Sequence, residues 1–119
     1  AKGFPSGKVH YSERLIDAAE REMQEKANIN GVELELRGNV SLRFLKDGEV
    51  VNHILAYVFY GEVPNELAIE HDHKYYFTYW GDASTIKDDM GFKGNKEILD
   101  LLENSKGFFF SELEFASDY

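Results

Sequence analysis

The sequence contains no cysteine, no run of basic residues and no apolar stretch long enough to cross a membrane. Without cysteine the chain can form no disulfide and can use no thiolate as a nucleophile or zinc ligand. Lys and Arg total 13 against 22 Asp and Glu, a net charge of −9 that repels DNA and RNA. We expect no membrane partner and, with no signal-peptide pattern at the N-terminus, a cytoplasmic protein.

The composition is that of a folded protein. Of the 119 residues, 43% are hydrophobic and 14% aromatic, which is enough for a modest core. The sequence shows no repeat, no low-complexity tract and no linker. We therefore expect one α/β domain with a mixed sheet over residues 1–119.

Residues 13–27 carry a helical pattern without glycine or proline. An apolar stripe at three- and four-residue steps consists of Leu15, Ile16, Ala19 and Met23. Ser12 is the predicted N-cap. Glu22 and Glu25 lie three residues apart, so their carboxylates project from one side of the helix. Two such carboxylates suit Mg²⁺, and an acidic solvated helix face is the alternative.

A set of residues around this helix recurs at the spacing of a known signature. The set is Gly7, Glu13, Arg21, Glu22, Met23, Glu25 and Ile29. Residues 7–29 thus resemble the Nudix box, the loop–helix–loop of hydrolases that act on nucleoside diphosphates linked to another group. Lys26 stands where the box has its second paired Glu, and Asn28 where it has Gly. The lead-in at residues 4–8, Phe-Pro-Ser-Gly-Lys, is similar to the family's Phe-Pro-Gly-Gly-Lys.

This resemblance implies a Nudix-type α/β/α sandwich around a mixed sheet. In the family a few tens of residues, usually carrying one or two strands, precede the box, whereas only residues 1–6 do so here. We expect a domain without the usual N-terminal strands, and an N-terminal truncation of the domain would explain their absence. Because an exposed sheet edge invites pairing, a homodimer or another partner that completes the sheet is a further expectation.

The resemblance also implies hydrolysis of a pyrophosphate bond in a nucleoside di- or triphosphate, assisted by Mg²⁺ or Mn²⁺. The implied catalytic residues are Glu22, Arg21 and Glu25. The implied metal ligands are Glu22, Glu25, the Ser6 carbonyl and Glu70, with Asp72 as the alternative to Glu70. Near the phosphates it implies Lys8 and Gly7, and it gives Glu13 the role of bracing the loop against the helix.

Lys26 is the departure that bears on activity. It replaces a metal-ligand Glu by a positive charge, and it lies four residues after Glu22, the favourable spacing for a helical ion pair. The alternative function is therefore a catalytically weak or inactive Nudix domain that acts as a nucleotide- or protein-binding module.

Beyond the box, the sequence predicts strands and one further helix. The predicted strands are 32–37, 40–44, 49–60, 75–80 and 108–115. We expect turns at Gly38-Asn39 and at Asp47-Gly48, and a strand buried on both faces at residues 54–59. The second helix is expected to begin with Asn95 as its N-cap and to end near Gly107.

This order of elements, with Leu101-Leu102 before residues 107–110, loosely resembles the MutT-like subgroup that hydrolyses oxidised purine nucleoside triphosphates such as 8-oxo-dGTP. Asp88 and Asp89 would then be the acid pair that reads the base, and the alternative is a pair of solvated loop residues. His71 and His73 are read as surface-loop residues, and a zinc site is the alternative.

Overall fold

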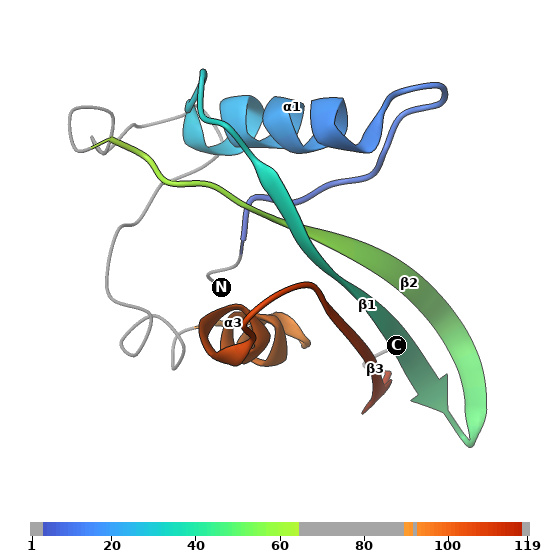
Figure 1. Ribbon diagram of the computed structural model, residues 1–119. Coiled ribbons are helices and arrows are strands. Elements are labelled where there is room, and N and C mark those ends of the chain that lie inside the picture. Colours follow the sequence, from blue (N-terminus) through green and yellow to red (C-terminus); the bar gives the residue numbers. More distant parts are fainter. Residues whose placement is uncertain (1–3, 65–89, 92, 118–119) are drawn as a thin grey trace.

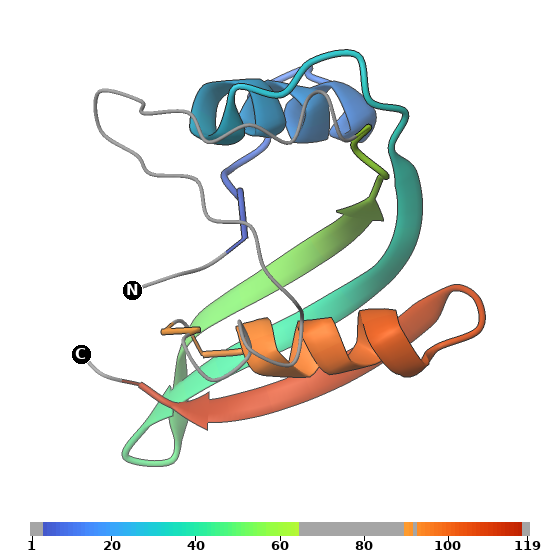
Figure 2. The same ribbon diagram turned by 90° about the vertical axis from the view of Figure 1, so that its left-hand side faces the viewer.

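The computed structural model describes residues 4–64, 90–91 and 93–117. Its elements are helix α1 (Leu15–Ala27), strands β1 (Glu35–Lys46) and β2 (Glu49–Tyr60), helix α3 (Asn95–Asn104) and strand β3 (Phe109–Ala116). The sheet lies between the two helices (Figures 1 and 2). The predicted α/β class with helices on either side of a sheet is confirmed.

The described sheet is mixed, as the sequence predicts. Its strand order is β2-β1-β3. The central strand β1 pairs with β2 antiparallel and with β3 parallel. The predicted Asp47-Gly48 hairpin is also confirmed, because both residues have positive φ (54° and 80°) and join β1 directly to β2.

The turn predicted at Gly38-Asn39 is wrong. Both residues lie within the continuous strand β1, next to an irregularity in its pairing with β2 between Leu36 and Gly38. A β-carbon at position 38 would overlap the ring of Phe109, so glycine serves here to let an aromatic side chain pack on the strand backbone.

The prediction that residues 54–59 are buried on both faces is also wrong. Strand β2 is an edge of the described sheet, and Ile54, Leu55 and Tyr57 are exposed. An apolar run therefore does not by itself place a strand at the centre of a sheet. A partner that completes the sheet stays a prediction.

The core lies between α3 and the sheet. Val40 and Leu42 of β1 contact Ile98 of α3 and Phe109 of β3, and all four residues are buried. Around them pack the partly buried Phe4, Phe44, Ala56, Val58, Leu101, Leu102, Leu113 and Phe115. Because Val40, Leu42 and Phe44 alternate along β1, one face of that strand supplies most of this contact.

Both predicted N-caps are wrong by one or two positions. Arg14 precedes α1 and makes no side-chain capping bond, while Ser12 lies in a left-handed turn with φ of 67°. Gly94 precedes α3, and Asn95 is its first helical residue.

The predicted strand at 75–80 lies outside the described residues. None of the helices in the described part of the chain has the length and apolar character that crossing a membrane requires.

Candidate active site

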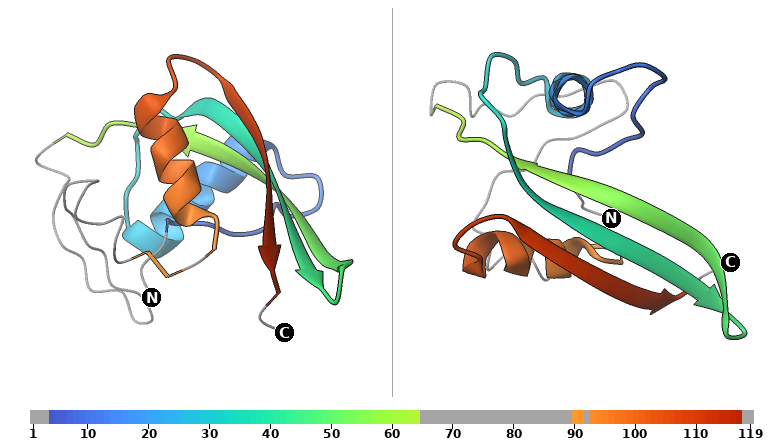
Figure 3. Two further views of the ribbon diagram at one scale, coloured as in Figure 1. Left: turned by 90° about the horizontal axis from the view of Figure 1, so that it is seen from below. Right: turned by 45° about the vertical axis from the view of Figure 1, so that its right-hand side comes forward.

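The segment before α1 folds back along that helix. Residues 4–13 run beside α1 and then turn into it (Figures 1 and 3). The Glu13 N–H donates to the His10 carbonyl at 3.0 Å, and the Glu13 carboxylate accepts from the His10 N–H at 3.0 Å. This closed turn shifts the start of α1 to Leu15. Backbone groups of residues 6–8 therefore come within reach of α1 side chains.

Arg21 is the centre of the contacts between this segment and α1. Its Nε and Nη2 donate to the two oxygens of Glu13 at 2.9 and 3.0 Å. Nη2 also donates to the Lys8 carbonyl at 2.9 Å, and Nη1 donates to Glu22 Oε1 at 2.7 Å. The planar fork of a guanidinium allows this combination, which a lysine ammonium could not reproduce.

The contact with Arg21 changes the electrostatics of Glu13. Hydrogen bonds from the Arg21 side chain, and next the bond from the His10 N–H, lower the pKa of Glu13 to about 2. In return, the hydrogen bond with Glu13 is the largest cause of a raised pKa for Arg21. Both groups stay charged at neutral pH, so the turn is linked to α1 by a permanent ion pair.

The Glu22 carboxylate is buried beneath the folded-back segment. Glu22 is only 8% exposed, the lowest exposure of any charged residue in the described part of the chain. A β-carbon at position 7 would overlap Glu22 Oε1, so Gly7 is the residue type that admits this carboxylate. Glu22 Oε2 is buried and accepts no hydrogen bond. A buried carboxylate oxygen of this kind requires a nearby positive charge.

Lys26 supplies that charge. Its Nζ lies 3.2 Å from Glu22 Oε2, which confirms the predicted Glu22–Lys26 ion pair. The same ammonium donates a hydrogen bond to the Ser6 carbonyl. One lysine therefore joins a carboxylate of α1 to the backbone of the preceding segment.

Glu25 differs from Glu22 in its exposure. Its side chain is 50% exposed, and its Oε2 makes one long contact of 3.5 Å with Arg21 Nη1. Glu25 and Glu22 approach the same guanidinium, as expected for residues three apart on a helix. Glu25 is thus the carboxylate of this cluster with access to solvent.

The described residues do not fit a bound divalent ion in the arrangement seen here. Among them, no group of three or more Asp, Glu, His or Cys side chains gathers as a metal site. The Ser6 carbonyl and Glu22 Oε2 do converge on one cation, but that cation is the ammonium of Lys26. A divalent ion at the position of that ammonium would have to displace it, because like charges at such short range repel strongly.

The other predicted site residues lie outside the described residues. These are Glu70, Asp72, His71, His73, Asp88 and Asp89. Sequence reasoning missed two backbone groups of the cluster, the Lys8 carbonyl and the His10 N–H. It expected the Ser6 carbonyl on a metal ion and missed the bond that this carbonyl accepts from Lys26. No side-chain pattern signals a backbone contact, so these depend on how the segment folds back.

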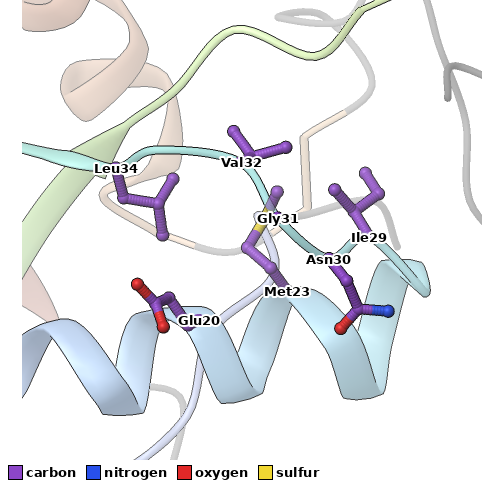
Figure 4. Close-up of a pocket in the computed structure, with 7 residues that line it drawn as sticks. All are labelled: Glu20, Met23, Ile29, Asn30, Gly31, Val32 and Leu34. Atoms are coloured by element: carbon purple, nitrogen blue, oxygen red, sulfur yellow. The ribbon is translucent and has the colours of Figure 1, made fainter.

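A small cavity lies at the C-terminal end of α1. Its volume is about 150 Å³, and it is lined by Glu20, Met23, Ile29, Asn30, Gly31, Val32 and Leu34 (Figure 4). Glu20 is its only charged lining residue. Because Glu20 precedes Glu22 by two residues, about 200° of helical rotation separates the two side chains. The cavity is therefore distinct from the Arg21 cluster.

A mixed sheet between two helices, with a loop folded onto an Arg-Glu-rich helix, defines this chain as a Nudix-type α/β protein. The NUDIX domain profile matches residues 1–102, and the chain belongs to the Nudix family. The crystal structure of the mutator MutT protein from Bacillus halodurans is similar, with a TM-score of 0.74. The match has 18% sequence identity and covers 97% of this chain and 74% of that one, which establishes the fold alone. No curated protein sequence matches the chain significantly.

Proposed function

We propose that this Nudix domain hydrolyses a phosphoanhydride bond in a nucleoside diphosphate linked to another group. The observation that supports the proposal best is the buried Glu22 carboxylate against Gly7, with Arg21 on one of its oxygens. Burying a charge in a small domain lowers the free energy of unfolding. Such a buried charge is therefore more typical of a functional site than of a part that only stabilises the fold. Family membership supplies the reaction class.

In this proposal Glu25 is the general base. It is half-exposed and lies beside Arg21, whereas both oxygens of Glu22 face cations. Water attacks a phosphorus atom, its proton passes to Glu25, and the bond to the bridging oxygen breaks with the electron pair leaving on the departing phosphate. Glu22, Arg21 and Glu13 are positioning residues, and Lys8 offers a positive charge to the phosphates.

We propose that Mg²⁺ or Mn²⁺ participates as the counter-ion of the nucleotide phosphates. Mg²⁺ usually keeps several waters and binds through substrate phosphates, so it does not need a complete protein cage. This role agrees with the contacts of Lys26, which occupies the oxygens of Ser6 and Glu22. No step of the proposed reaction depends on an ion held by the protein.

The test is hydrolysis of a panel of nucleoside diphosphate derivatives and nucleoside triphosphates, including 8-oxo-dGTP, with and without Mg²⁺ and Mn²⁺. We expect the native chain to release a nucleoside monophosphate, and we expect Glu25→Gln to lower the turnover about 100-fold or more. Glu49→Gln, an exposed change in the β1–β2 hairpin, is the matched control and should keep full turnover. Equal turnover of the native chain and Glu25→Gln would show that Glu25 is not the base.

A binding module without turnover is the second candidate, and the contacts of Lys26 favour it. Lys26 occupies the Ser6 carbonyl and Glu22 Oε2, which a metal ion needed for hydrolysis would otherwise bind, while Lys8 still offers its charge to the phosphates. A nucleotide that binds only the folded state raises the melting temperature. A rise of this kind with no product released would support the binding module and contradict the hydrolase.

A further inference from the structure

The Glu22 carboxylate is compensated entirely by cations of the chain itself. Arg21 Nη1 lies 2.7 Å from Oε1, and Lys26 Nζ lies 3.2 Å from Oε2. The side chains of Arg21 and Lys26 are 20% and 30% exposed, so both pairs are partly shielded from water. A carboxylate with a cation on each oxygen needs no external ion to stay charged while buried.

Lys26 also fixes the segment that covers Glu22. Its ammonium donates to the Ser6 carbonyl, one residue before the glycine that lies against the carboxylate. An ammonium has three donors and no acceptor, so it can join a carbonyl and a carboxylate oxygen. Divalent cations form the same kind of bridge between oxygen atoms.

We propose that Lys26 is an internal cation of this site: its ammonium holds Ser6 to Glu22, and a divalent ion can bind these two oxygens only by displacing it. The inference rests on the proposed function in taking residues 6–26 as the functional site, but it does not require turnover. Lys26 is therefore a positioning residue, and the folded arrangement of Ser6 and Glu22 does not require Mg²⁺ or Mn²⁺.

Lys26→Met should open the position of the ammonium to a divalent ion. Methionine keeps most of the length of the side chain and removes the charge, so the Ser6 carbonyl and Glu22 Oε2 lose the ammonium that they share. Two oxygen ligands completed by water are a binding site that Mg²⁺ and Mn²⁺ accept. Lys26→Met should therefore respond to these ions, whereas the native chain should not.

The experiment is thermal unfolding of the full chain by circular dichroism, with EDTA and then with increasing Mn²⁺ or Mg²⁺. In EDTA we expect Lys26→Met to melt about 3–6 °C below the native chain. Mn²⁺ should recover several degrees of that loss in Lys26→Met and shift the native chain by less than about 1 °C. If Lys26→Met is unfolded in EDTA, Mn²⁺ should restore its folded signal.

Two variants control for charge and for nonspecific binding. Lys26→Arg keeps a cation at the position and should stay insensitive to Mn²⁺. Lys96→Met removes an exposed lysine from α3 and should behave as the native chain does. Equal stabilisation of the native chain and Lys26→Met by Mn²⁺ would overturn the proposal, and so would the absence of any response in Lys26→Met. Because the readout is unfolding, a failure to hydrolyse nucleotides would count against the proposed function and not against this inference.

Discussion

Helices α1 and α3 lie on either side of the same sheet but are held by different interactions. Helix α3 buries Ile98 and packs Leu101 and Leu102 against the core. Helix α1 buries Ala18, Glu22 and Ala27. The Glu22 carboxylate is paired with the Arg21 guanidinium and the Lys26 ammonium. Apolar burial has no preferred direction, whereas ion pairs and hydrogen bonds require set distances and angles.

This difference separates the part of the molecule that stabilises the fold from the part that shapes the site. Substitutions near α3 should change the free energy of unfolding according to the volume they remove. Substitutions near α1 should change the position of Glu22 and hence activity, with smaller losses of stability. Substitutions of Phe109, Gly7, Glu13 and Arg14 test this separation, with expected effects that decrease in that order.

The largest effect on stability is expected at Phe109. Phe109 is 5% exposed and packs over the backbone of Gly38, so Phe109→Ala should lower the free energy of unfolding by about 3–5 kcal/mol. The neighbouring Phe110 is 62% exposed, and Phe110→Ala should cost less than about 1 kcal/mol. Urea unfolding measures both variants, and equal losses would show that Phe109 is not a core residue.

Gly7→Ala should affect activity more than stability. The added β-carbon would overlap Glu22 Oε1, so the carboxylate or the segment must move. A displacement of about 1 Å can reduce turnover roughly 100-fold. Gly107→Ala is the matched control, because a β-carbon there meets no atom within 4 Å and the residue has no positive φ. If turnover of Gly7→Ala equals that of the native chain, Glu22 does not depend on its contact with Gly7.

Glu13 should make the stability of the chain fall with acid. Its pKa is about 2 in the folded chain against an ordinary value of 4.5. A lowered pKa contributes stability above pH 4.5, and this contribution is lost as the pH falls from 4.5 towards 2. Urea midpoints between pH 6 and pH 2.5 should therefore decrease less steeply in Glu13→Gln than in the native chain. Parallel decreases would mean that the Glu13–Arg21 pair does not stabilise the folded state.

The smallest effect is expected at the start of α1. Arg14 occupies the N-cap without a side-chain capping bond, and its ion pair with Asp17 is exposed. Arg14→Ser should supply the missing bond and raise the melting temperature by about 2–4 °C, because the lost surface ion pair contributes little. Arg14→Ala gives neither the cap nor the pair, and a melting temperature as high as that of Arg14→Ser would exclude capping as the cause.

The elements with strong local signals could be predicted from the sequence. The helical pattern of α1, the Asp47-Gly48 hairpin and β3 appear within a residue or two of their expected bounds, and α3 ends at Asn104, three residues before the expected Gly107. Each depends on periodicity or turn chemistry that lies within the element itself. Such signals can be read without knowing which other elements pack against the helix or strand.

Features that depend on distant contacts could not be predicted. A glycine such as Gly38 is equally typical of a turn and of a strand position covered by an aromatic ring. The structure shows the second case, because the ring of Phe109 from β3 packs on Gly38. The apolar run of β2 does not show which strands lie beside it. In the candidate site, the Glu22–Lys26 pair follows from helical spacing, whereas the bond from Lys26 to the Ser6 carbonyl requires the folded-back segment.

The most direct single measurement is Mn²⁺ binding by electron paramagnetic resonance, comparing the native chain with Lys26→Glu. Lys96→Glu is the control, since it changes the net charge of −9 by the same amount. If Lys26 occupies the cation position, Lys26→Glu should bind one Mn²⁺ that neither the native chain nor Lys96→Glu binds. Mn²⁺ bound equally well by the native chain would contradict the assignment of this position to Lys26.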